Sequence, residues 1–189
     1  FVRTGPKGKR VKPRHFVGLF KNHCRTGQMW YDTGCRRCVS GEEEHRRLHR
    51  ELAKYGIVPE RVESDEDFVF GDGETTSSRC AYRYPVFLSG KFRGLINIAN
   101  VPVPCPPLFS LDMAKKWKCK TDHEHDTIHL GEFNYTIHFK DTPYVDILDF
   151  GAKGKPDGLH LLPNSLKMTK EEFERSKEPT FQDRQRAAR

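Results

Sequence analysis

Short β-prone segments separated by turn residues dominate this chain and restrict the fold that it can adopt. The two longest, residues 82–88 and 94–101, are joined by Ser89-Gly90-Lys91, and a short linker with Gly between two such segments is typical of a β-hairpin. We expect strands at residues 28–31, 68–70, 82–88, 94–101, 126–130 and 135–139. The sequence therefore predicts a mainly β fold with small α insertions.

One segment has a clear helical pattern. Residues 41–55 carry three consecutive glutamates, Glu42 to Glu44, in the first turn, which suits the positive end of a helix dipole, and apolar residues then recur at helical spacing until Gly56 closes the helix. A short helix is expected at residues 112–118. Thr169 and Glu172 have the spacing of a capping box, which indicates a further helix at the start of a charged tail.

A short apolar segment, residues 29–31, leads directly into Asp32, Thr33 and Gly34. At the end of a strand, Thr and Gly can hold a tight loop from which the Asp points into a cleft. Aspartic peptidases present their catalytic carboxylate in this way. Asp32 is therefore the first candidate for a catalytic residue.

Four motifs in the same order along the chain resemble the retropepsins, the aspartic peptidases of retroviruses and retrotransposons, and in particular those of copia-like elements. They are Asp32-Thr33-Gly34-Cys35, Phe68-Val69-Phe70-Gly71-Asp72-Gly73, Pro107-Leu108-Phe109-Ser110-Leu111-Asp112 and Asp122-His123-Glu124-His125-Asp126-Thr127-Ile128. The resemblance covers about residues 24–130. It implies a closed antiparallel β-domain with a helical insertion at residues 41–56 and irregular terminal extensions.

The resemblance also implies how the site would work. Asp32, Thr33 and Gly34 would form the catalytic loop, and Gly71, Asp72 and Gly73 would form a flap that binds substrate. The chain has one Asp-Thr-Gly triplet, so activity would require a homodimer with Asp32 from each subunit. Two carboxylates about 3 Å apart share one proton, so one acts as a base on water while the other protonates the peptide carbonyl. This chemistry requires neither a metal nor a cofactor.

A second interpretation is a domesticated retropepsin fold that serves as a non-catalytic accessory subunit of a larger assembly. Trp30 and Tyr31 place bulky rings beside Asp32, and Arg36-Arg37 would favour its ionised form over proton sharing. Hydrophobic residues make up 35% of the chain, which is low for a compact globule. On the sequence alone we favour the accessory subunit, with the active endopeptidase as the alternative.

The formal net charge of +7 is unevenly distributed. Residues 3–25 contain many lysines and arginines and no acidic residue, a pattern that favours nucleic acid, anionic lipid or an acidic protein surface as the partner. We divide the chain into a basic arm (1–22), a β-domain (23–140) and a C-terminal extension (141–189). Residues 1–22 and 151–189 are expected to lie outside the core and to contact partner subunits.

Six cysteines are scattered without the spacing of a disulfide framework, so we expect reduced thiols. Cys24, Cys35, Cys38 and His45 are an alternative zinc-ligand set, because Cys-x-x-Cys suits tetrahedral zinc. A second metal alternative is a pair drawn from His123, His125 and His129. We favour unrelated side chains in both cases and predict no metal.

The chain begins with Phe1, which suggests a processed product or a fragment. We expect an intracellular protein, with mitochondria or another organelle as the candidate location after removal of a transit peptide. No apolar run reaches the ~18–20 residues of a spanning helix. No membrane span is therefore predicted.

Overall fold

The computed structural model describes residues 25–70, 73–140 and 142–176. The strands are β1 (Gln28–Asp32), β2 (Val39–Gly41), β3 (Glu60–Val69), β4 (Thr75–Leu88), β5 (Lys91–Val101), β6 (Leu108–Ser110), β7 (Cys119–Asp122), β8 (Thr127–Leu130), β9 (Tyr135–His138) and β10 (Tyr144–Asp146). The helices are α2 (Glu42–Ala53), α3 (Leu111–Lys116) and α4 (Lys170–Ser176), with 3-10 turns η1 (Leu159–Leu161) and η2 (Asn164–Leu166). The predicted mainly β fold is confirmed.

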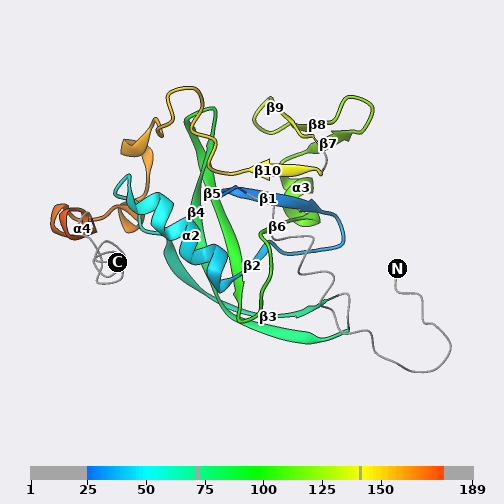
Figure 1. The fold of residues 1–189 in the computed structure, drawn as a ribbon, viewed down its shortest axis with the longest axis horizontal. Helices are drawn as coiled ribbons and strands as arrows, with labels where there is room; N and C mark the ends of the chain where they lie inside the picture. Colours follow the sequence, from blue (N-terminus) through cyan, green and yellow to red (C-terminus); the bar gives the residue numbers. More distant parts are fainter. Residues whose placement is uncertain (1–24, 71–72, 141, 177–189) are drawn as a thin grey trace, which may run out of the picture.

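Seven strands form one mixed sheet in the order β10-β1-β6-β2-β5-β4-β3, and β7-β8-β9 form a separate antiparallel sheet. In Figure 1, α2 lies against the long β4–β5 hairpin, while the small sheet lies beside β10 at another end of the molecule. Within the described residues, β10 pairs only with β1 and β3 only with β4, so the large sheet is open. The described residues therefore form an open, mixed sheet and not the closed antiparallel β-domain that the resemblance implied.

The sheet is not purely antiparallel, because it contains the parallel pairs β1–β6 and β2–β5. Parallel neighbours cannot be joined by a tight hairpin, because the chain must cross over before it can return in the same direction. Here, the chain between β1 and β6 includes α2 and the long β3–β4–β5 meander. Strand β1, which ends at Asp32, is consequently held between two strands from much later in the sequence, β6 and β10.

Several local elements lie where the sequence predicted them, but β3 and β4 begin earlier than expected, at Glu60 and Thr75, and β2, β6, β7 and β10 were not predicted. α2 has three glutamates in its first turn and buries Leu48 and Leu52 against the sheet, as predicted for residues 41–55. Ser89 and Gly90 both have positive φ and form the turn between β4 and β5. α3 and the β8–β9 hairpin also lie where they were expected.

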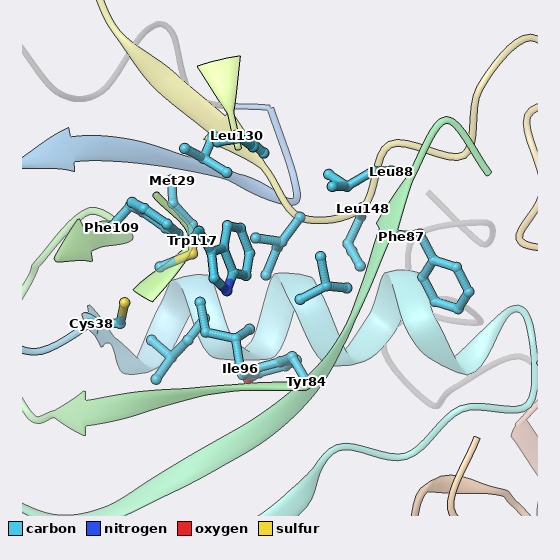
Figure 2. Close-up of a cluster of buried hydrophobic side chains, with 14 of the residues drawn as sticks. Met29, Cys38, Tyr84, Phe87, Leu88, Ile96, Phe109, Trp117, Leu130 and Leu148 are labelled. Carbon is cyan, nitrogen blue, oxygen red and sulfur yellow. The ribbon is translucent and has the colours of Figure 1, made fainter. Parts of the chain in front are cut away.

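Aromatic side chains connect the two sheets. The Tyr31 ring stacks on Phe109 at a centroid distance of 6.1 Å, Phe109 lies 5.0 Å from Trp117, and Trp117 lies 5.0 Å from Phe133. Figure 2 shows Trp117 within the buried cluster, with Met29, Phe109 and Leu130 around it. The core therefore lies where β1, β6, α3 and the small sheet meet.

The domain continues past the boundary expected at residue 140. β10 pairs with β1, and Leu162 and Leu166 are buried, with the Val58 N–H donating to the Leu166 carbonyl at 3.0 Å. The expectation that the segment after residue 151 lies outside the core is therefore wrong for the described part of that segment. Single leucines fill gaps in the core there, and such isolated residues leave no periodic signal. Residues 1–22 and 177–189 lie outside the described residues.

The capping box predicted for the tail helix is confirmed. The Thr169 N–H donates to Glu172 Oε2 at 2.8 Å, and the Glu172 N–H donates to Thr169 Oγ1 at 3.2 Å. α4 then packs through Phe173, whose ring lies near Gly56 at the end of α2. No helix among the described residues is both long and apolar enough to cross a membrane.

The buried carboxyl of Asp146 on β10 makes the stability of the fold depend on pH. Burial raises the pKa of its carboxyl to about 6, the charge of nearby Asp149 adds to this, and the Leu148 N–H bond opposes it. Because the folded pKa exceeds the unfolded one, the contribution to stability is present below about pH 4 and is lost as the pH rises through 6.

We therefore compare the free energy of unfolding of Asp146→Asn with that of the wild type. The difference in favour of Asp146→Asn should increase by about 2 kcal/mol from pH 4 to pH 8, a figure reduced for partial solvent exposure. Urea unfolding at both pH values measures this difference. Exposed Asp157→Asn is the control and should show the same pH dependence as the wild type. Identical pH profiles for Asp146→Asn and the wild type would contradict the prediction.

Candidate active site

Asp32 is the last residue of β1, as predicted, and a tight turn follows it. The Gly34 N–H donates to Asp32 Oδ1 at 2.8 Å, and the Cys35 N–H lies 3.3 Å from the Asp32 carbonyl oxygen. Thr33 and Gly34 are exposed, while Asp32 is partly exposed. A Cβ at Gly34 would lie 3.1 Å from Asp32 Oδ1, so a larger residue there would crowd the carboxylate.

The residues after this turn are held by the junction of β6 and α3. Ser110 pairs with Asp32 in the β1–β6 register, and the Leu111 N–H donates to the Cys35 carbonyl at 2.8 Å. Ser110 Oγ accepts the Met113 N–H at 3.2 Å and lies 3.4 Å from the Cys38 sulfur. One buried hydroxyl thus caps α3 and contacts the chain that leaves the Asp32 turn.

Sequence reasoning did not assign a role in this site to Ser110 or Cys38. Ser110 had a detectable signal, because a serine directly before a short helix is a typical N-cap. Cys38 had none, since its contact with Ser110 spans 72 positions in the sequence.

Ser110→Ala is expected to lower the free energy of unfolding by about 1–2 kcal/mol, because α3 loses its cap and a buried thiol loses its acceptor. Urea denaturation measures the loss. Exposed Ser165→Ala is the matched control and should differ from the wild type by less than about 0.5 kcal/mol. Equal stability of the two variants would show that the Ser110 hydroxyl does not anchor this junction.

Two residues that weighed against catalysis are engaged with other groups. Arg37 Nε lies 3.3 Å from Glu66 Oε1, and its Nη1 lies 3.8 Å from Asp112 Oδ2. Successive residues of a strand face opposite sides, so Tyr31 lies on the face of β1 opposite to Asp32, where it packs on Phe109. Burial raises the pKa of the Tyr31 hydroxyl. Trp30 is on the same face of β1 as Asp32 by this alternation, so the objection from its bulk remains.

Of the predicted flap, Gly71 and Asp72 lie outside the described residues. Gly73 has a φ of 80°, and its N–H donates to the Phe70 carbonyl at 2.8 Å. Phe68 and Phe70, at the β3–β4 hairpin, pack on a second apolar cluster. The cluster comprises Val39, Ala99, Val101 and Cys105, with Cys35, Val103 and Leu108 at its margin. The hairpin thus contacts a cluster that includes Cys35 of the Asp32 turn.

Within the residues that the structure describes, the candidate metal ligands do not come together. The described residues contain no group of three or more His, Cys, Asp or Glu side chains that could hold a metal ion. Cys24 lies outside them, Cys35 donates to the Arg37 carbonyl at 2.8 Å, and His45 is buried against Tyr84. His125 pairs with Asp122, and His129 with Thr136.

The described cysteines are free thiols. Burial is the main cause that raises the pKa of Cys35 to about 11 and that of Cys105 to about 12. Both thiols are therefore protonated at neutral pH and poor nucleophiles.

No protein-family model matches the chain, and no curated protein matches it either. The resemblance to retropepsins therefore depends on the four ordered sequence motifs.

Proposed function

We propose that the chain is one subunit of a homodimeric aspartic endopeptidase of the retropepsin type. The observation that carries the proposal is the Asp32 carboxylate at the end of β1, in a tight turn whose Thr33 and Gly34 are exposed. An exposed turn of this kind is open to a second copy of itself. Because each chain has one such triplet, two copies are needed to bring two carboxylates together.

The Gly34 N–H holds one oxygen of the Asp32 carboxylate, so the other oxygen is the one proposed to face the partner. Two carboxyl groups at about 3 Å cannot both ionise, and they share a proton. The charged one then accepts a proton from water as the water attacks the peptide carbonyl. The neutral one donates its proton to the carbonyl oxygen.

The β3–β4 hairpin is proposed to be the flap that covers a bound peptide. Phe68 and Phe70 already lie on a cluster that includes Cys35 of the Asp32 turn. The Arg37–Glu66 ion pair also joins the segment after Asp32 to β3. A peptide held between hairpin and turn would be shielded from water, which strengthens the electrostatic interactions around the carboxylates.

The test is a cleavage assay on a mixture of unstructured peptides between pH 4 and pH 7, with and without pepstatin. We expect pepstatin-sensitive cleavage whose rate per chain falls on dilution as dimers dissociate. Sedimentation at the same concentrations measures the dimer fraction. No cleavage by a demonstrated dimer, or cleavage by a monomer, would overturn the proposal.

The accessory subunit is the second candidate, favoured by the bulk of Trp30 on the Asp32 face and by the acid-free basic segment 3–25. In this role, the terminal arms would contact other subunits or nucleic acid, within a mitochondrial or other organellar assembly. Purification of the tagged chain from its native cells distinguishes the two. A stable complex containing one copy of the chain and no cleavage activity would favour the accessory role.

A further inference from the structure

The interface between α2 and the large sheet is apolar at one end and polar at the other. Leu48 and Leu52 are buried in the main core, whereas His45, one turn earlier, is 3% exposed and has polar neighbours. On the sheet below, Ser40 and Asn100 are register partners. Asn100 in turn pairs with Cys80 on β4. Polar groups thus occupy the part of the sheet under the first half of the helix.

A chain of three hydrogen bonds crosses this interface. The Ala99 carbonyl can only accept, so His45 Nε2 carries a proton and donates to it at 3.3 Å. His45 Nδ1 is then an acceptor and takes the Tyr84 O–H at 2.6 Å. The Tyr84 oxygen accepts in turn from His49 Nε2 at 3.0 Å. The Tyr84 O–H keeps this acceptor only while His45 Nδ1 is unprotonated, whereas His49 Nε2 is a donor in either protonation state.

Solvent has a route to this chain. A cavity of about 190 Å³ is lined by Glu42, His45, Arg46, His49, Tyr82 and Asn100. Two buried oxygens nearby, Ser40 Oγ and Asn100 Oδ1, have no hydrogen-bond partner among the described residues. The polar end of the interface is therefore weakly satisfied and open to proton exchange.

The surroundings oppose a positive charge on either imidazole. Burial is the main cause that lowers the pKa of His45 to about 4, and burial also lowers the pKa of His49. The two rings also lie close, at a centroid distance of 6.5 Å, so a charge on His49 opposes one on His45. Backbone hydrogen bonds to Ala99 and Ser40 favour the charge, but to a smaller extent.

Few charged side chains face the pair. From α2 these are Glu42 and Arg46, which pair with each other at 3.0 Å. The facing residues of β4 are Cys80, Tyr82 and Tyr84, and burial raises the pKa of Tyr84, so its hydroxyl stays neutral. β5 contributes Asn100, which is uncharged. Among the described residues, no unpaired carboxylate lines the cavity to balance an imidazolium.

We propose that His45, Tyr84 and His49 form an acid-sensitive joint that releases the first half of α2 from the sheet when the imidazoles take up protons. A proton from solvent on His45 Nδ1 turns that atom into a donor, so the buried Tyr84 O–H loses its acceptor. The pKa of His45 is lower in the folded chain than in the unfolded chain. The stability that neutral His45 contributes is therefore present above pH 6.5 and is lost as the pH falls through 4.

The joint is connected to Asp32 through the sheet. α2 follows directly on β2, β2 pairs with β6 at Val39 and Leu108, and β6 places Ser110 opposite Asp32. Release of α2 would therefore loosen the frame of the Asp32 turn and limit activity on the acid side. This consequence depends on the proposed peptidase function, whereas the joint itself does not.

The test compares the pH dependence of unfolding in the wild type, His45→Phe and the control His138→Gln, whose histidine is exposed on β9. Between pH 7 and pH 4, the unfolding constant of the wild type should rise on the order of 100-fold more than that of His45→Phe. His138→Gln should behave as the wild type. If His45→Phe does not fold, His49→Gln takes its place and should show a smaller difference of the same sign.

Hydrogen exchange locates the effect. In the wild type at pH 4, corrected for intrinsic exchange rates, the amides of residues 45–49 should lose protection before those of β4 and β5. Equal pH dependence in the wild type and His45→Phe, or uniform loss of protection across α2 and the sheet, would overturn the proposal. Neither measurement uses peptidase activity, so a failed cleavage assay and a failed joint are separate results.

Discussion

Asp32→Asn is expected to lower peptide cleavage by at least about 10³-fold while the domain remains folded. An asparagine can neither accept a proton from water nor share one with the partner carboxylate, so both halves of the acid–base chemistry are lost. The side-chain oxygen of asparagine can still accept the Gly34 N–H, which preserves the turn. The measurement is kcat/KM on one cleaved peptide, together with the melting temperature of each chain.

Asp126→Asn is the matched control. Asp126 is exposed at the turn before β8 and has a φ of 51°, a conformation that asparagine tolerates. This variant should cleave at the wild-type rate. If Asp32→Asn cleaved as fast as Asp126→Asn, Asp32 would not be catalytic, and the accessory-subunit interpretation would gain support.

Phe109→Ala is expected to have the largest effect on stability, a loss of about 3–5 kcal/mol in the free energy of unfolding. Phe109 is fully buried and lies between Tyr31 on β1 and Trp117 after α3. Truncation leaves a cavity where the two sheets meet, and rigid neighbours cannot fill it. A loss of this size corresponds to a fall in melting temperature of about 10 °C or more.

Phe109→Leu should lie between the wild type and Phe109→Ala, because it keeps most of the buried volume. Val69→Ala is the surface control, since Val69 is 71% exposed, and should change stability by less than about 0.5 kcal/mol. Calorimetry on the wild type and the three variants gives the order of their melting temperatures. Equal losses for Phe109→Ala and Val69→Ala would show that the aromatic contacts between the sheets do not stabilise the domain.

Local sequence signals placed the elements that depend on residues a few positions apart. The glycine turn between β4 and β5, the acidic start of α2 and the Thr169–Glu172 capping box all lie as predicted. The position of Asp32 at the end of β1 is of the same kind. Each of these features is set by backbone preference or by hydrogen bonds within one turn, so it can be recognised in a short window.

Tertiary structure alone decided how these elements are combined. The parallel pairing of β1 with β6, the contact of Cys38 with Ser110 and the hydrogen bond of His45 to Tyr84 join residues far apart in the sequence. Leu162 and Leu166 are likewise buried, although no periodic pattern of apolar residues around them predicts this. The sequence determined a mainly β chain with an aspartate at a strand end. The open sheet, the support of the Asp32 turn and the polar joint under α2 arise from burial and register, which depend on the whole fold rather than on any one segment.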